Sequence, residues 1–190
     1  MWNNSGVNAL NVLGIDIGSD HCGLACLYLQ EKQLVKSECV SIISKGSHRL
    51  FARQPIQPSI KMRVMGEQIL QYVNTWTPDV IVIEQPFVNS LFPHVAIRLY
   101  RLFYHLFDIL SVHCPHIEKY AITAPKARKL LMYNKSLGVT TKDAVKCSIK
   151  NVPELVNIVH NLDELDEHAL DAIVCSYAYC KINILETTNV

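Results

Sequence analysis

Apolar residues recur along the chain with two spacings, which predict strands and helices. Five short runs are expected to form strands, at residues 12–15, 23–29, 33–43, 80–83 and 120–122. The fourth run contains only Val and Ile, which is typical of a central strand that is covered on both faces. Gly18 and Gly23 are predicted to bracket a tight turn between the first two strands.

Longer segments show the spacing of amphipathic helices. Two segments, at residues 125–132 and 141–150, are expected to form short basic helices, and the amphipathic spacing is found at residues 59–76, 93–112 and 164–185. In the last of these segments Leu165, Ala169 and Ile173 step along one side of the expected helix. The polar, basic and proline-containing residues 44–58 are expected to form a loop.

The order of these elements predicts a fold class. The chain runs through three strands, a helix, a strand, a helix, a strand and further helices. This order describes an antiparallel portion that is extended by parallel crossovers. We therefore expect an α/β fold, with a five-stranded mixed sheet and helices on both faces. The length of 190 residues suits one domain. We place this domain at residues 12–185, between an N-terminal extension at 1–11 and a tail at 186–190.

Composition narrows the class of protein. Hydrophobic residues make up 49% of the chain and charged residues 18%, as in a folded domain. No apolar run is long enough to cross a membrane, and the first residues do not resemble a signal peptide. Several of the seven cysteines lie in apolar segments, so we expect buried free thiols and a reducing, cytoplasmic setting. Structural zinc is the alternative, although the spacings of Cys22 from Cys26 and of Cys175 from Cys180 are unusual for it.

Charge is unevenly distributed, although the formal net charge is only +1. Residues 39–66 hold five basic residues and no acidic one, and residues 119–150 hold eight basic residues with Asp143 as their one acid. Acidic residues then gather between Glu154 and Asp171, a stretch without Lys or Arg. Basic surface beside an acidic centre suits an enzyme that binds a polyanion and holds cations at the bond it cuts. Ordinary solvated charge is the alternative.

Two acidic residues directly follow buried strands. Asp16 comes after residues 12–15 and Glu84 after residues 80–83. A buried carboxylate is unfavourable unless a partner compensates its charge, and open α/β sheets hold their sites at the C-terminal ends of their strands. We therefore expect Asp16 and Glu84 to converge. For either acid alone, a strand-end or turn role is the alternative.

Further polar side chains lie in the last predicted helix. His168 and Asp171 are three residues apart and therefore share one helix face, and Asp166 or Glu167 could substitute for His168. Carboxylate oxygens suit Mg²⁺, with Mn²⁺ as a substitute. Two such ions ~4 Å apart can stabilise an in-line displacement at phosphorus. A nearby lysine would then offset charge on the phosphate.

Taken in order, these segments resemble the RuvC family of Holliday junction resolvases. The resemblance covers residues 12–181 and rests on Leu13-Gly14-Ile15-Asp16-Ile17-Gly18-Ser19, Ile83-Glu84-Gln85-Pro86-Phe87 and His168-Ala169-Leu170-Asp171-Ala172. Ile17 stands where bacterial members usually have proline. This departure leaves a phage or other viral origin as open as a bacterial one.

The resemblance implies an RNase H-like fold and a role for each matched residue. Asp16, Glu84, His168 and Asp171 would hold two Mg²⁺ ions per active site, with Lys142 as the catalytic lysine. Such enzymes are homodimers that cut four-way or branched DNA, and residues 93–112 resemble their dimer helix. The residues implied to contact nucleic acid are Phe87, Lys126, Arg128, Lys129, Lys142 and Lys146.

Other functions stay open at this point. The same fold suits a nuclease for flaps, other branched DNA or RNA–DNA hybrids. Residues 14–19 also resemble the phosphate turns of sugar kinases and actin-like ATPases, although such proteins usually need two lobes and a second phosphate loop. A DNA-binding module without catalytic activity is a further alternative. The sequence does not indicate a host, a cleavage-sequence preference or a helicase partner.

Overall fold

Five strands form one mixed sheet in the computed structural model, which describes residues 9–18, 20–43, 58–86, 93–133 and 140–185. The strands are β1 (Ala9–Ile17), β2 (His21–Gln30), β3 (Gln33–Ile43), β4 (Val80–Gln85) and β5 (Glu118–Thr123). Their order in the sheet is β3-β2-β1-β4-β5. β2 is antiparallel to both β1 and β3, whereas β4 is parallel to β1 and to β5.

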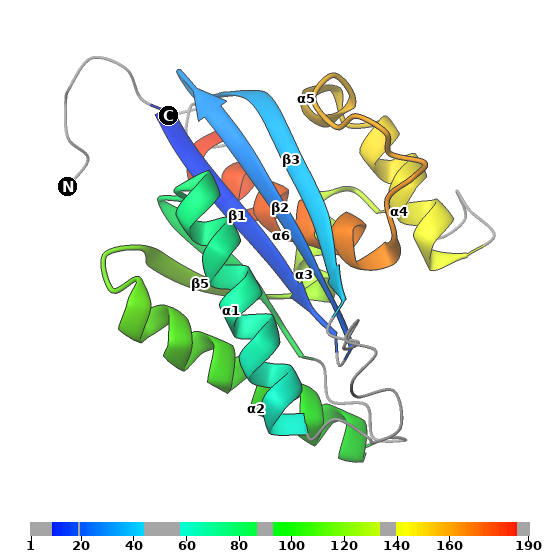
Figure 1. Cartoon of the computed structure of the whole chain (residues 1–190). Coiled ribbons are helices and arrows are strands. Elements are labelled where there is room, and N and C mark those ends of the chain that lie inside the picture. The colour runs from blue at the N-terminus through cyan, green and yellow to red at the C-terminus, as the bar shows by residue number, and fades with distance from the viewer. Residues whose placement is uncertain (1–8, 19, 44–57, 87–92, 134–139, 186–190) are drawn as a thin grey trace.

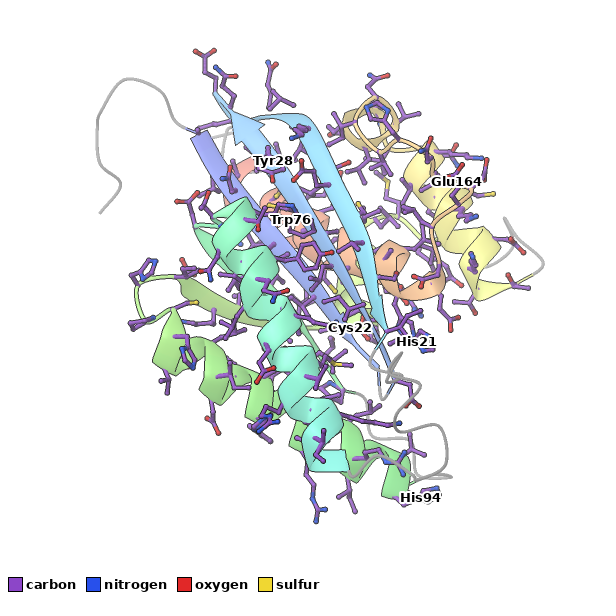
Figure 2. All side chains as sticks on the ribbon, viewed as in Figure 1. His21, Cys22, Tyr28, Trp76, His94 and Glu164 are labelled. Carbon is purple, nitrogen blue, oxygen red and sulfur yellow. The ribbon has the colours of Figure 1, made fainter. Side chains whose placement is uncertain are left out.

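Helices cover both faces of this sheet (Figure 1), and side chains fill the space between the layers (Figure 2). One face carries α1 (Pro58–Trp76) and α2 (Pro93–His113). The other carries α3 (Ala124–Leu130), α4 (Thr141–Lys150), α5 (Pro153–Val156) and α6 (Glu167–Cys180). The predicted α/β class, a five-stranded mixed sheet with helices on both faces, is confirmed.

The alternation of side chains along β1 and β4 decides which residues face α6. Val12 of β1 and Val82 of β4 pack in the core on the α6 side, whereas Leu13 packs on the side of α1 and α2. Successive residues of a strand point to opposite faces. Asp16 follows Val12 by four residues, and Glu84 follows Val82 by two. Both intervals are even, so the two acids lie on the α6 side of the sheet.

Two glycines let the backbone of α6 lie directly against β1 and β2. A Cβ atom at Gly14 would lie 2.1 Å from the carbonyl oxygen of Ala172, and one at Gly23 would lie 1.9 Å from that of His168. The strand predicted to begin at Gly23 begins two residues earlier, at His21, and Gly23 is paired with Asp16 within β2. Its missing side chain serves helix packing.

The ends of several elements differ from the prediction. β1 begins at Ala9, so residues 9–11, assigned to an N-terminal extension, belong to the sheet. α6 begins at Glu167 rather than at 164, because the Asp166 side chain accepts a hydrogen bond of 2.9 Å from the backbone N–H of Ala169 and so caps the helix. Residues Lys181–Leu185 continue as a π-helical turn. The short helix α5 was not predicted.

Some expectations concern parts of the chain that lie outside the described residues. These parts are residues 44–57 of the expected loop, Phe87, and the tail at 186–190. Among the described helices, none is both long enough and apolar enough to span a bilayer. All seven cysteines are free thiols and five of them are buried, as the sequence predicted.

Candidate active site

Asp16 and Glu84 lie on neighbouring parallel strands, near the C-terminal ends of both. β1 and β4 are in register at Ile15 and Ile83, so the two acids follow at the same level. They also lie on the same face of the sheet, and both are partly buried. The strands therefore place the two carboxylates side by side beneath α6.

α6 brings His168 to Asp16. Nδ1 of His168 lies 2.6 Å from Oδ2 of Asp16, and this hydrogen bond raises the pKa of His168 although burial opposes the rise. His21 stacks on His168, with ring centroids 5.8 Å apart and planes 5° apart. Figure 2 shows His21 at the end of the sheet where β2 begins. The imidazole of His168 is thus held by a carboxylate and by a second ring, which the sequence had not indicated.

Burial and neighbouring charges alter the acidity of Glu84. Burial, followed by the negative charges of Asp16 and Asp171, raises the pKa of Glu84 to about 8. The Cys175 thiol donates a weak hydrogen bond of 3.8 Å to Oε2 of Glu84. Without a bound metal ion, this carboxyl therefore holds its proton at neutral pH.

Asp171 is paired with a residue of α3. Nη2 of Arg128 donates to both carboxylate oxygens of Asp171, at 3.0 Å and 2.9 Å. Burial raises the pKa of Asp171, and the charge of Arg128 opposes this rise. Lys126 and Lys129 of the same helix are exposed, and Lys126 donates to the Tyr120 hydroxyl at 3.3 Å. Among the basic residues of α3, Arg128 is thus the one that reaches the acids.

The two lysines predicted on α4 differ in their surroundings. Lys142 lines a shallow hollow together with Arg128 and Asp171. Lys146 donates a hydrogen bond of 2.9 Å to the backbone oxygen of Asp163. Lys142 therefore borders the acid cluster, and Lys146 is engaged by the segment that precedes α6.

The acids considered as substitutes for His168 have other surroundings. Asp166, besides capping α6, accepts a hydrogen bond of 2.6 Å from the Ser41 hydroxyl. Glu167 is exposed at the rim of the hollow. His168 is the member of this group that contacts Asp16.

The charges of the cluster suit a divalent cation, although its side chains are engaged elsewhere. Among the described residues, no three His, Cys, Asp or Glu side chains surround a common cation position. Asp16 is bound to His168, and Asp171 to Arg128. However, burial and mutual repulsion raise the pKa of both Glu84 and Asp171, and a bound cation relieves this imbalance. Carboxylate oxygens are the donors that fit Mg²⁺ or Mn²⁺.

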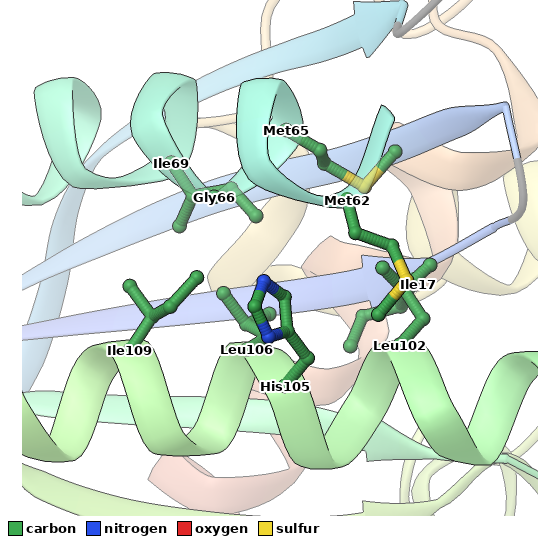
Figure 3. A pocket seen from close by; sticks show the side chains of 9 residues that line it. All are labelled: Ile17, Met62, Met65, Gly66, Ile69, Leu102, His105, Leu106 and Ile109. Carbon is green, nitrogen blue, oxygen red and sulfur yellow. The ribbon is translucent and has the colours of Figure 1, made fainter. Parts of the chain in front are cut away.

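A second hollow, between α1 and α2 near the end of β1, has different chemistry. This hollow is lined by Met62 and Met65 of α1, by the imidazole of His105 on α2 and by aliphatic side chains (Figure 3). Its described lining contains no carboxylate, lysine or arginine. The groups suited to phosphate chemistry therefore gather on the α6 side of the sheet.

Together, the fold and the site define an RNase H-like α/β domain with an acidic cluster at the C-terminal ends of β1 and β4. Thermus thermophilus RuvC in complex with a Holliday junction substrate has this fold, with a TM-score of 0.61 and 14% identity over 92% of this chain and 97% of that chain. The yeast mitochondrial Holliday junction resolvase Ydc2 has it too, with a TM-score of 0.61 and 15% identity over 90% of this chain and 78% of that chain.

Sequence comparison adds nothing to this structural likeness. No protein-family model matches the chain, and no curated protein matches it. The RuvC-like fold that the sequence motifs predicted is confirmed by the solved structures. At such low identities the likeness establishes the fold, and the activity must be argued from the side chains.

Proposed function

We propose that this chain is a metal-dependent DNA endonuclease that resolves four-way junctions. The observation that carries the proposal is the convergence of Asp16, Glu84 and Asp171, from β1, β4 and α6, beside Arg128 and Lys142. RuvC and Ydc2, which share the fold, are Holliday junction resolvases. This shared fold supports four-way DNA as the substrate.

Each side chain of the cluster has a role in this proposal. Asp16, Glu84, Asp171 and His168 would hold two divalent ions, Mg²⁺ or Mn²⁺. Such ions, bound ~4 Å apart, stabilise the attacking and the leaving oxygen of an in-line displacement. Because Nδ1 of His168 is bound to Asp16, its Nε2 is the atom that would hold a cation or orient the attacking water. Lys142 would contact an oxygen of the phosphate.

Basic residues of α3 and α4 would extend the contact with DNA. Lys126 and Lys129 are exposed on α3, and Lys142 and Lys146 lie on α4. Both helices lie on the same side of the sheet as α6 (Figure 1). Contacts from these lysines to backbone phosphates would position the junction over the acids. Stacking of Phe87 on an unpaired base stays a prediction.

We also propose a homodimer, formed through α2. Ile97, Tyr104 and Val112 are 56%, 60% and 73% exposed on this helix. Their spacing puts them along one side of α2, on the face of the sheet opposite to α6. Two copies joined there would present two acid clusters, which suits a substrate of approximate two-fold symmetry.

A comparison of substrates tests the proposed activity. In the presence of Mg²⁺ the purified protein is expected to cut a four-way junction at paired positions, and to cut it faster than a flap, a linear duplex or an RNA–DNA hybrid. Chelation of the metal is expected to stop the reaction. Faster cutting of the hybrid would refute the junction assignment.

Sedimentation velocity on the same preparation tests the proposed dimer. A single monomeric species would contradict it.

Glu84→Gln is expected to stabilise the metal-free protein, to an extent that depends on pH. The pKa of this carboxyl is about 8 in the folded chain, against an ordinary value of 4.5. The folded state therefore keeps a proton that the unfolded state releases, so wild-type stability falls as the pH rises from about 4.5 to about 8. The glutamine variant lacks this loss. We expect it to be more stable by about 1–3 kcal/mol at pH 8 and by much less at pH 4.

Urea unfolding in the presence of a chelator, across this pH range, measures the difference. Glu67→Gln on α1, where the glutamate side chain is 63% exposed, is the matched control and is expected to show no such pH dependence. Saturating Mg²⁺ is expected to reverse the order of the two proteins, because a bound cation stabilises the ionised wild-type carboxylate. Equal stability of wild type and Glu84→Gln at pH 8 without metal would show that Glu84 is not electrostatically strained.

A further inference from the structure

Arg128 and Asp171 form an ion pair that joins α3 to α6 within the acid cluster. Nη2 of Arg128 lies 3.0 Å from Oδ1 and 2.9 Å from Oδ2 of Asp171, and the two side chains are 28% and 18% exposed. One nitrogen thus serves both oxygens. Nε of Arg128 is buried and has no hydrogen-bond partner within the described part of the chain. The guanidinium therefore has an unmatched donor, and an acceptor that reached it would be favoured.

This ion pair competes with the cation that the cluster suits. Asp171 is one of the three converging carboxylates, and both of its oxygens face Arg128. The positive charge of a guanidinium at this distance opposes the approach of another cation. The positive charge of Arg128 also lowers the pKa of Glu84. In this arrangement Arg128 would itself weaken the binding of a metal ion.

The proposed substrate offers an anion that would take Arg128 from Asp171. Arg128, Thr141, Lys142 and Asp171 line the same hollow, between α3, α4 and α6. A phosphodiester group presents two oxygens that can accept from Nε and Nη2 of one guanidinium together. Once the guanidinium turns away from Asp171, such a contact would satisfy the Nε donor that is buried and unmatched in the pair, and Lys142 would add a second positive charge.

We infer that Arg128 exchanges Asp171 for a DNA phosphate, so that DNA and divalent metal bind this chain cooperatively. Without DNA, Arg128 holds Asp171. With DNA, the phosphate holds Arg128, and Asp171 is released to the metal. Each ligand then raises the affinity for the other by the same factor. The inference rests on the proposed function, because it takes Asp171 as a metal ligand and DNA as the substrate.

Calorimetric titration with Mn²⁺ in the absence of DNA tests this exchange. Arg128→Gln removes the competing cation and is expected to bind Mn²⁺ about tenfold more tightly than the wild type. Arg128→Lys keeps the charge without the planar fork and is expected to lie between the two. Arg63→Gln removes the same kind of charge from α1, on the opposite face of the sheet, where the Arg63 side chain is 71% exposed, so its Mn²⁺ affinity is expected to stay within about twofold of wild type. Circular dichroism establishes that each variant is folded.

DNA affinity provides a second measurement. Fluorescence anisotropy follows binding of a labelled four-way junction with and without Ca²⁺, and gels of the same samples monitor cleavage. We expect the metal to strengthen junction binding by the wild type about tenfold. For Arg128→Gln we expect a smaller factor, because Asp171 is already released before DNA binds.

The possible failures can be told apart. If Arg128→Gln binds Mn²⁺ no more tightly than the wild type, the exchange is overturned. Should that variant fail to fold, Arg128→Lys decides, and wild-type affinity of this variant overturns the exchange as well. If instead Asp16→Asn binds Mn²⁺ as the wild type does, the acid cluster is not the metal site and the proposed function fails. Loss of Mn²⁺ binding in Asp16→Asn with no gain in Arg128→Gln refutes the exchange alone.

Discussion

Replacing Asp16 with asparagine is expected to lower the rate of junction cleavage by about 10³-fold or more, while junction binding persists. Asp16 lies beside Glu84 on the neighbouring strand and holds His168 at 2.6 Å. An amide carries no negative charge, so the variant would lose one of the proposed cation ligands and weaken the hold on His168 at the same time. Cleavage rates on gels and anisotropy with labelled junction measure the two quantities separately.

Glu31→Gln is a suitable control for this substitution. Glu31 is exposed and follows Gln30, which pairs with Ala9 at the end of the β1–β2 ladder opposite to Asp16. The control removes one negative charge far from the cluster and is expected to cut like the wild type. Cleavage at a normal rate by Asp16→Asn would exclude the β1 acid from the catalytic centre.

Replacing Gly14 with alanine is expected to destabilise the fold by about 3 kcal/mol or more. The added Cβ would lie 2.1 Å from the carbonyl oxygen of Ala172 and 2.9 Å from the backbone nitrogen of Ser176. Both are backbone atoms of α6, which cannot rotate aside as a side chain can. The helix must shift away from β1 and take Asp171 with it, so cleavage is expected to fall together with stability. Urea unfolding measures the loss of stability.

Gly66→Ala provides the matched control for Gly14→Ala. Gly66 lies within α1, and a Cβ there would meet the end of the Ile109 side chain at 2.7 Å, which can move. Alanine also favours a helix over glycine by ~1 kcal/mol. We expect the stability of this variant to stay within about 1 kcal/mol of wild type. A similar loss in both variants would show that close packing of α6 on β1 is not the cause.

The residues of its own strand with which each acid shares a face were predictable, because strand alternation is a local property. Once residues 12–15 and 80–83 are taken as strands, the next residues of each strand have a fixed face. Asp16 and Glu84 follow the same alternation as Val12 and Val82. Alternation fixes the face of each carboxylate within its own strand, whereas their meeting depends on the long-range pairing of β1 with β4.

The basic residue that meets the acids could not be identified in the same way. Lys126 and Arg128 are two residues apart, so on α3 they point in nearly opposite directions. Both are basic and α3 is only seven residues long, so its apolar spacing does not determine which side faces inward. The packing of α3 against α6 makes that decision, and it turns Arg128 towards Asp171.

Gly23 shows how a local rule fails for a tertiary reason. Glycine near a strand end commonly borders a turn, which is why the predicted turn reached as far as Gly23. In the structure its missing side chain admits the carbonyl of His168, a residue far along the chain. The position of α6 must be known before this role can be recognised.

The acids come from the first strand, the fourth strand and the last α-helix, which has a consequence for biosynthesis. No stretch of chain shorter than residues 16–171 contains all three carboxylates. While the chain is being translated, the centre cannot assemble until Asp171 has left the ribosome and α6 has docked against β1 and β2. If the chain is the nuclease proposed above, a nascent chain would therefore not cut the nucleic acids around it, because the acid cluster is complete only in the finished fold.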